Sequence, residues 1–379
     1  MDFNLTSEQQ LIKQTAADFS KEELLHGVVD RDKNKIWPKD QISKMANLGF
    51  MGMMVEEKWG GSGLDTISYC IAMEEISKVD ASAGVIMSVN NSLVCYLLNK
   101  YGNDFIKKKY LAPLAQGNKL GAFSLSEPQS GSDASNMKTY ARLDGGHYIL
   151  SGTKNWVTNG IHCDSVIVFA LTEKNLGHKG ISCFIVDKSI EGFSTGKPEE
   201  KLGIRSSDTC ELYFDNVRVP KENLIGKEGD GFKIALSTLD GGRIGIASQA
   251  LGIAQAALDA SIRYSKERVQ FNKPISANQG IQFKLADMAM EIEASRLLIY
   301  KAALAKDKGE DYGHMASMAK VFASEVAMKS STQCVQIHGG YGYIKETGVE
   351  RLMRDAKITQ IYEGTSEIQR VVIARELLK

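Results

Sequence analysis

The sequence Ile181-Ser182-Cys183-Phe184-Ile185-Val186 is short and almost continuously apolar, as a strand in the core of a sheet would be. Further runs rich in β-branched and aromatic residues lie on both sides of it, separated by clusters of Gly, Asp, Asn and Lys. These runs cover residues 140–143, 148–155, 166–171 and 212–219. Several short strands at this spacing predict a small antiparallel β-sandwich or β-barrel.

Helical periodicity replaces this pattern on both sides. Before the strands, Ser7 and Gln10 fit a capping box, and Glu74 is expected to face outward from its helix. The helix over residues 83–99 is apolar all round, which is typical of a helix buried in a bundle or an oligomer. The helices expected here cover residues 39–48, 67–79, 83–99 and 105–114. After the strands, long apolar repeats predict a four-helix bundle over residues 232–239 leading into 244–268, then 279–306, 314–337 and from 366 onward.

We therefore expect an α+β multi-domain fold. Its parts are an N-terminal α-helical domain, a middle antiparallel β domain and a C-terminal four-helix bundle. The expected boundaries are residues 1–121, 122–226 and 227–379.

Composition narrows the classes of function. The 46 basic and 46 acidic residues balance, so no electrostatic argument favours nucleic acid or an anionic membrane surface. The six cysteines are scattered without a C-x-x-C pair, which favours reduced thiols over a metal cage or a disulfide scaffold. No signal peptide is visible at the start, and no segment reads as apolar for long enough to span a bilayer. The expected location is cytoplasmic, or the mitochondrial matrix if a transit peptide has been removed.

Glycine fingerprints of nucleotide-binding folds are absent from the sequence. Neither G-x-G-x-x-G after a strand nor G-x-x-x-x-G-K-[ST] occurs, which disfavours a Rossmann site and a P-loop. The motifs G-x-S-x-G and H-E-x-x-H do not occur either. Any nucleotide site must therefore be built in another way.

Four other segments are candidates for binding. Residues 121–133 combine hydroxyls and backbone donors suited to a polar ring or a phosphate; the alternative is a hinge loop with serine caps. Trp156 beside Thr158 is suited to stack on a flat cofactor; the alternative is a tryptophan in the β core. Three glycines follow His338 and allow close backbone approach to a ligand, although this histidine is expected to be structural. The arginines suited to grip a phosphate, unless each pairs with a carboxylate or solvent, are Arg243, Arg268 and Arg354.

The carboxylate of Glu363 lies where one helix is expected to stop and another to begin. It follows the apolar Ile361 and Tyr362 and precedes Gly364, a flexible joint, and Ser366, a candidate N-cap. Apolar surroundings raise a carboxyl pKa and make a better base near neutral pH. The alternative is a solvated glutamate in a linker.

Together these segments resemble one family over essentially the whole chain, the acyl-CoA dehydrogenases. Residues 123–133 look like the family's first signature, although Asn136 stands where that signature usually ends in a small residue. Residues 336–342, followed by 354–358 and 361–365, look like the second signature. Residues 201–205 and 240–244 also match, and the likeness to the short-chain (butyryl-CoA) members is carried by residues 71–76 and 84–93.

The resemblance implies that FAD binds without a Rossmann fold. Around its isoalloxazine ring the implied residues are Phe123, Leu125, Ser126, Gly131, Ser132, Trp156, Val157 and Thr158. For the pyrophosphate and adenine, partly from a neighbouring subunit, they are Arg268, Gln279, Gln336, Ile337, His338, Gly339 and Gly340. The FAD site is completed by Thr365, Ser366 and Glu367. For the acyl-CoA substrate the implied residues are Ser132, Asp240, Arg243 and Gly364. No metal is implied.

The resemblance also implies the reaction. Glu363 matches the catalytic base, which some relatives carry at the position of Gly242. The base takes the pro-R α-proton of a short-chain acyl-CoA, a β-hydride passes to flavin N5, and trans-2-enoyl-CoA forms, as in fatty acid β-oxidation. Electrons then pass to an electron-transferring flavoprotein, and the enzyme is a homotetramer, a dimer of dimers.

Several alternatives stay open. The same chemistry run in reverse is that of an enoyl-CoA reductase fed by a bifurcating flavoprotein. The substrate can instead be a branched or cyclic acyl-CoA, and the acceptor can be oxygen. A non-catalytic helical scaffold that keeps the fold is the alternative outside enzymes.

Overall fold

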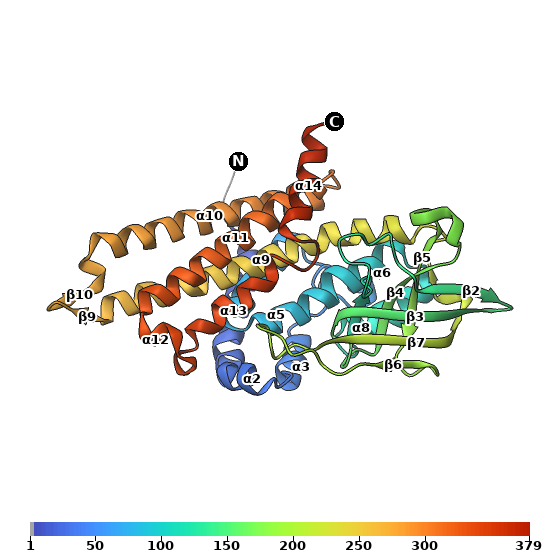
Figure 1. Cartoon of the computed structure of the whole chain (residues 1–379), viewed down its shortest axis with the longest axis horizontal. Coiled ribbons are helices and arrows are strands. Elements are labelled where there is room, and N and C mark those ends of the chain that lie inside the picture. The colour runs from blue at the N-terminus through green and yellow to red at the C-terminus, as the bar shows by residue number, and fades with distance from the viewer. Residues whose placement is uncertain (1–3) are drawn as a thin grey trace.

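The computed structural model describes residues 4–379. Residues 1–3, which open the predicted N-terminal domain and the start that shows no signal peptide, lie outside the described part. The molecule is elongated, with the β domain gathered at one end and the long helices α9, α10 and α11 running along its length (Figure 1). The predicted order of helical domain, β domain and helical bundle is confirmed. The domain boundaries proposed at residues 121 and 226 stay a prediction.

Short helices form the N-terminal part. Helix α1 begins after Thr6, whose side chain accepts the Gln9 N–H while the Gln9 side chain accepts the Thr6 N–H. The predicted capping box at Ser7 and Gln10 is therefore wrong by one residue. The α-helices are α1 Ser7–Phe19, α2 Val28–Asn34, α3 Lys39–Asn47, α4 Thr66–Val79, α5 Ala81–Ser88, α6 Tyr96–Tyr101, α7 Asp104–Ile106 and α8 Ala112–Ala115. The π-helical stretches between them are η1 Ser20–Leu24, η3 Val89–Cys95 and η4 Lys107–Leu111.

Helices α5, η3 and α6 join into one continuous apolar rod over Ala81–Tyr101. By length and composition alone this rod could cross a membrane, so the expectation that no segment qualifies is wrong. However, 94% of its most apolar window is buried inside the protein. The rod is therefore a core helix, as its all-round apolar pattern predicted.

The middle domain is an eight-stranded sheet in the order β6-β7-β3-β2-β4-β5-β8, with β1 pairing in parallel with β4. Most pairs are antiparallel as predicted, and β1, β6 and β8 are strands that the sequence did not reveal. The strands are β1 Gly121–Ser124, β2 Tyr140–Asp144, β3 His147–Thr158, β4 Ser165–Leu171, β5 Ile181–Asp187, β6 Phe193–Thr195, β7 Thr209–Pro220 and β8 Leu224–Ile225. The apolar run Ile181–Val186 forms all but the last residue of β5, and all six of its residues are buried.

The C-terminal part is built on α9, which runs unbroken for 37 residues through Gly241 and Gly242. At 1.5 Å per residue the helix is about 55 Å long. The other helices are α10 Gln279–Asp307, α11 Gly313–His338, α12 Gly340–Tyr343, α13 Val349–Thr359 and α14 Ser366–Leu377, and α9 itself is Gly231–Glu267. A two-stranded hairpin follows α9, formed by β9 Val269–Gln270 and β10 Lys273–Pro274.

One hydrophobic core joins the two helical parts, because buried residues of α4, α5, α9, α10 and α11 belong to a single cluster. Glu74 on α4 is buried and accepts hydrogen bonds from Arg296 on α10, at 2.7 and 3.3 Å. The prediction that Glu74 faces outward is therefore wrong. Its carboxylate is buried because a guanidinium from another helix pairs with it, which a helical pattern cannot reveal.

Candidate active site

The turn between α13 and α14 carries Glu363. Two successive residues have left-handed backbone, with φ of 52° at Glu363 and 91° at Gly364. For a residue with a side chain this conformation costs on the order of 1 kcal/mol, and such strain gathers at functional sites. Glu363 therefore belongs to neither helix, and its side chain does not follow the course of α13 or α14.

Three side chains hold this turn. Lys320 on α11 donates to the Gly364 carbonyl at 2.8 Å. The Gln369 amide donates to the carbonyls of Glu363 and Gly364, at 3.1 and 2.8 Å. Thr365 caps α14 by accepting the Ile368 N–H at 3.3 Å, so the prediction of Ser366 as the cap is wrong by one residue.

The Glu363 carboxylate faces helix α9 at Gly242. A Cβ at Gly242 would lie 2.0 Å from Glu363 Oε2 and 2.7 Å from Leu93 Cδ2. Glu363 as a whole is half-buried, but Oε2 is buried and has no hydrogen-bond partner in the structure. Burial raises the pKa of Glu363 to about 8, although the positive charges of Lys320 and Arg243 oppose the shift. The alternative of a solvated linker glutamate is therefore wrong.

Arg243 and Asp240 lie near Glu363 on the start of α9. Arg243 is 5% exposed, and its Nη1 donates to Asp240 Oδ1 at 2.7 Å and to Ser317 Oγ at 3.3 Å. Its Nε is buried without a partner. Burial lowers the pKa of Arg243 and raises that of Asp240. The site therefore contains a buried guanidinium, that of Arg243, with one hydrogen-bond donor, Nε, that has no partner.

A buried ion pair fixes the loop after β1. Lys154 on β3 is fully buried and donates to Glu127 at 2.8 Å and to the Leu125 carbonyl at 3.2 Å. Glu127 also accepts the backbone N–H groups of Lys138 and Thr139. Burial acts to raise the pKa of Glu127, but Lys154 and the hydrogen bonds outweigh it and lower the pKa to about 2. Sequence reasoning missed this pair; the only signal was a lysine within an otherwise regular strand.

The residues implied for a flavin ring gather around this loop and the end of β3. Trp156 is 61% exposed with φ of 60°, so the alternative of a tryptophan in the β core is wrong. The Asn155 N–H donates to the Ser126 carbonyl at 2.9 Å and joins the loop to the strand. Gly131 and Ser132 are exposed, and Thr158 is half-buried. In contrast, Val157 and Leu125 are buried, so they can offer a ligand little besides backbone atoms.

The rod Ala81–Tyr101 connects this loop region with Glu363. A Cβ at Gly121, the first residue of β1, would lie 2.6 Å from Val94 Cγ1. Leu93, the preceding residue of the rod, lies equally close to Gly242. The adjacent residues Leu93 and Val94 of the rod therefore lie against α9 at Gly242 and against β1 at Gly121, respectively. Phe123, also on β1, packs edge-on against Phe169 with ring centroids 5.2 Å apart.

A second group of implied residues lines an open groove of about 600 Å³ at the far end of α9. Arg268 lies there with its guanidinium 5.7 Å from the ring centre of Tyr341. Gly339 and Gly340 are exposed, and so are Gln336 and Gln279 nearby. The lining residues are Tyr264, Arg268, Gln270, Ile275, Ile337, His338, Gly339, Gly340, Tyr341 and Ile344.

The ring of His338 makes its contacts with other residues of the fold. Its Nδ1 lies 2.8 Å from the Cys334 carbonyl, and its ring stacks on Tyr264 with centroids 4.2 Å apart. Burial lowers the pKa of His338. Ile337 is also buried. These contacts support the structural role that the sequence favoured for His338, as a wall of the groove.

The two groups of implied residues are far apart within one chain. Gly242 and Arg268 are separated by 26 positions of α9 and its cap, about 39 Å at 1.5 Å per residue. In Figure 1 the groove end, near α12 and β9, is opposite the β domain. The groove therefore lies at the opposite end of α9 from Gly242 and Glu363, away from the β domain that carries the residues implied for the flavin ring.

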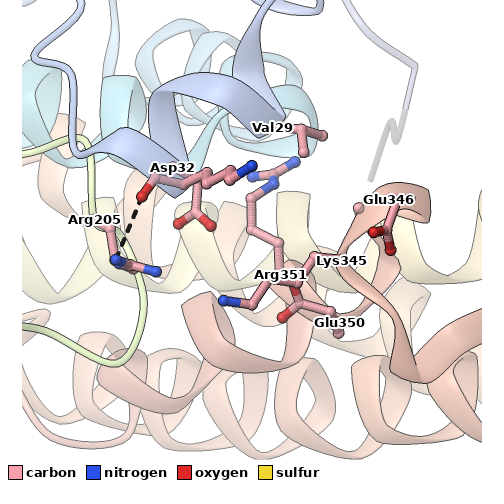
Figure 2. Close-up of a pocket in the computed structure, with 9 residues that line it drawn as sticks. Val29, Asp32, Arg205, Lys345, Glu346, Glu350 and Arg351 are labelled. Carbon is pink, nitrogen blue, oxygen red and sulfur yellow. Dashed lines mark hydrogen bonds between the residues drawn. The ribbon is translucent and has the colours of Figure 1, made fainter.

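Arg354 has no spare capacity for phosphate. Its guanidinium pairs with Asp32 at 2.6 Å and with Glu350. Its partners Asp32 and Glu350 line a smaller hollow of about 200 Å³ that contains none of the implied ligand residues. Figure 2 shows that basic and acidic side chains alternate around this hollow. The residues that line the hollow are Val29, Asp32, Lys33, Arg205, Lys345, Glu346, Gly348, Glu350 and Arg351. Because these charges nearly balance, we do not assign the hollow a ligand.

No group of three or more His, Cys, Asp or Glu side chains within residues 4–379 is arranged to hold a metal ion. All six cysteines are free and buried. Among the described residues, Glu363 and its basic neighbours Lys320 and Arg243 are therefore the titratable group that we consider for acid–base chemistry.

Comparison with known proteins agrees with this geometry. Family models match three consecutive segments: the acyl-CoA dehydrogenase N-terminal domain at residues 6–118, the middle domain at 122–217 and the C-terminal domain at 229–378. A short-chain specific acyl-CoA dehydrogenase of Clostridium acetobutylicum is 48% identical over 379 residues, which is 100% of both chains.

Two solved structures are also similar over their whole length. The butyryl-CoA dehydrogenase of Megasphaera elsdenii has 50% identity and a TM-score of 0.99, with 100% of each chain covered. A chain from work on the electron transferring flavoprotein of Acidaminococcus fermentans and flavin-based electron bifurcation has 53% identity and a TM-score of 0.99, again with 100% of each chain covered.

Proposed function

The chain belongs to the acyl-CoA dehydrogenase family, and from this premise we propose that it oxidises a short-chain, butyryl-CoA-like thioester to the trans-2-enoyl-CoA. The observation that carries the proposal is the buried, unpartnered Oε2 of Glu363, aimed at Gly242 from a strained turn. A desolvated carboxylate in this position is a general base. A non-catalytic scaffold would gain nothing from a buried carboxylate oxygen without a hydrogen-bond partner, which costs free energy of folding.

Glu363 removes the α-proton of the thioester. Its pKa of about 8 brings the base closer to the acidity of a thioester α-proton than an ordinary carboxylate would be. The developing enolate oxygen needs hydrogen-bond donors, and the Glu363 backbone N–H is the donor we assign. Arg243 keeps positive charge beside the carboxylate, so that enough of it stays ionised near neutral pH.

The exposed, polar residues found here fit FAD in two parts. The ring end would lie against Trp156, Thr158 and residues 123–132, where an exposed aromatic and free backbone groups meet. The turn residues Thr365, Ser366 and Glu367 complete this end. Its pyrophosphate and adenine would lie in the groove at Arg268, with Gln279 and residues 336–340. When bound, FAD supplies the acceptor for the hydride that leaves the β-carbon.

The thioester would lie between Glu363 and the ring end. We assign contacts with the acyl-CoA to Ser132, Asp240, Arg243 and Gly364. Space beside α9 is restricted at two glycines. A Cβ built at Gly242 would lie 2.7 Å from Leu93 Cδ2, and a Cβ built at Gly245 would lie 2.5 Å from the Tyr69 hydroxyl. The restricted space at these positions supports a short acyl chain and agrees with the names of the relatives.

The divided cofactor site supports a dimer, in which a second copy brings its Arg268 groove to the ring end of the first. The homotetramer proposed here, a dimer of dimers, contains two such pairs. Electron-transferring flavoprotein is the proposed electron acceptor, in agreement with the similarity to a chain studied with that protein. A cytoplasmic location is part of the proposal, and fractionation of the source cells tests it.

The same similarity favours a second candidate, enoyl-CoA reduction driven by a bifurcating flavoprotein. Both directions use Glu363 at the α-carbon. Initial rates with butyryl-CoA plus oxidised electron-transferring flavoprotein, and with crotonyl-CoA plus the reduced flavoprotein, distinguish them. Peroxide formation in air measures any oxidase activity.

The test of the proposal is Glu363→Gln, which keeps the size of the side chain and removes the base. General-base catalysis supplies roughly 10²–10⁴-fold, so we expect turnover to fall by about 10³-fold or more. The purified protein should remain yellow and still bind butyryl-CoA. The wild-type flavin should bleach on addition of butyryl-CoA. Near-normal turnover of the variant, or a folded wild type that takes up no FAD, contradicts the proposal.

A further inference from the structure

We infer that Lys320 is a positioning residue for Glu363: its ammonium group locks the turn that aims the Glu363 carboxylate at α9. Lys320 was not among the residues suggested by the sequence. The inference rests on the proposed function, because the aim of Glu363 matters to the reaction only if Glu363 is the base.

The first observation is the burial of Lys320. Its relative exposure is 0%, which is rare for lysine unless the charge is paired. Within residues 4–379, the hydrogen-bond acceptor recorded for its Nζ is the Gly364 carbonyl, at 2.8 Å. A buried ammonium has three donors and loses its hydration. Such a group is kept where one well-aimed hydrogen bond and a nearby negative charge offset that loss.

The second observation is the backbone that Lys320 grips. Glu363 and Gly364 are both left-handed, with φ of 52° and 91°, and a non-glycine residue holds this conformation only when its surroundings over-determine it. Gln369 supplies neutral hydrogen bonds to both carbonyls. Lys320 supplies the charged one while it is protonated, since burial lowers its pKa to about 8, and charge-assisted hydrogen bonds are about twice as strong as neutral ones.

The third observation is electrostatic. The groups that face Glu363 are Lys320 from α11, Arg243 from α9, Tyr69 from α4 and the adjacent Tyr362. Burial raises the pKa of Glu363, and Lys320 is the first of the two cations that oppose this rise. Removal of the ammonium should therefore raise the pKa of Glu363 further. One side chain thus sets both the direction and the ionisation of the base.

The experiment compares Lys320→Met, which removes the ammonium but keeps the length, with Lys320→Arg, which restores a cation. Lys329→Met is the matched control, since Lys329 is on the same helix with a side chain 53% exposed and paired with Glu291. Turnover per bound FAD with butyryl-CoA is measured from pH 6 to pH 10. A misplacement of about 1 Å can cost 10²-fold, so we expect Lys320→Met to lose roughly 10- to 100-fold in kcat, with KM changed by less than about threefold.

Two further readouts separate positioning from general loss of structure. The acid limb of the pH profile should move upward in Lys320→Met and return towards the wild-type value in Lys320→Arg. Exchange of the α-protons of acetyl-CoA with D₂O, followed by NMR, reports the base alone, because this thioester has no β-hydrogen. Exchange should slow in Lys320→Met in parallel with kcat and stay unchanged in Lys329→Met.

Turnover per FAD and exchange rates of Lys320→Met within twofold of wild type would overturn the inference. If Lys320→Met does not fold, Lys320→Gln, which keeps a neutral hydrogen-bond donor but removes the charge, replaces it. In that variant too kcat should fall and the acid limb should move upward, because the cation is gone; unchanged kcat with an unmoved acid limb overturns the inference. Failure of the proposed function is distinguishable, since the wild type and Lys329→Met would then show neither dehydrogenation nor exchange.

Discussion

The two ends of α9 are built in opposite ways. Near its start, Gly242 meets a buried carboxylate on a strained turn, surrounded by a fully buried lysine and a desolvated arginine. Past its end, Arg268 lies in an open groove with exposed glycines and glutamines. At the first end, burial raises the pKa of Glu363 to about 8; in the groove, burial lowers the pKa of His338.

This difference between the two ends of α9 corresponds to two tasks: proton transfer at the buried end and ligand binding at the open end. A base is tuned by exclusion of water and by fixed charges, so its surroundings must be complete within the fold. A dinucleotide tail needs donors, glycine backbone and access, so its surroundings stay open until the ligand and a second subunit arrive. The buried end should therefore respond to substitution through rate and pH, and the open end through FAD affinity.

The largest expected effect comes from moving the base. Glu363→Gly should lower turnover by about 10³-fold or more, while glycine accepts the left-handed backbone without strain. Adding Gly242→Glu should restore at least tenfold of that loss, because the position of a Cβ at Gly242 lies 2.0 Å from the present Oε2. Turnover per bound FAD with butyryl-CoA measures both.

The single variant Gly242→Glu is the control for this relocation. With both glutamates present, two carboxyl groups compete for one place and at least one is pushed aside or stays protonated. Its activity should fall well below that of the wild type. If the double variant binds FAD and acyl-CoA but recovers nothing, the buried end depends on more than the location of the carboxylate.

The second effect concerns the open end. Arg268→Ala removes a charged hydrogen-bond donor, which is worth roughly 1.5–3 kcal/mol, so the Kd for FAD should rise by about 10- to 100-fold. At saturating FAD, kcat and its pH profile should match the wild type. Lys266→Ala, an exposed residue on the last turn of α9, is the control and should leave the affinity unchanged. Fluorescence titration of the apoprotein measures these affinities.

Hybrid oligomers extend this second prediction to the divided site. When Arg268→Ala and Glu363→Gln chains are co-expressed with different tags, a mixed dimer contains one site with both residues intact. Activity at limiting FAD should therefore exceed that of either parent. Additive, unenhanced activity would place both groups of residues on one chain and contradict the subunit arrangement.

Much of this arrangement is readable from the sequence. Period changes predict the helical, β and helical parts, and the break after Tyr362 predicts a glutamate between two helices. The environment of that glutamate is not readable, because it is set by Lys320, 43 positions earlier, and by a glycine on a third helix. The same limit explains Glu74 and Lys154, whose charges are buried only because Arg296 and Glu127 arrive from distant segments. Local patterns do not contain such long-range pairs.

The smallest expected effect is a pH-dependent difference in stability between the two ends. The pKa of Glu363 is raised in the folded state, so its protonated form stabilises the fold, and this contribution is lost as pH rises through about 8. Glutamine stays neutral, so Glu363→Gln should gain in Tm relative to the wild type at pH 9 by about 2 °C more than at pH 5. Any Tm difference caused by Arg268→Ala should be the same at both pH values, because the substitution removes no group that titrates between pH 5 and pH 9. Calorimetry of the FAD-saturated proteins decides the matter: a pH-independent difference for Glu363→Gln would mean that the carboxylate is solvated in solution, and the contrast between the two ends would then lie in shape alone.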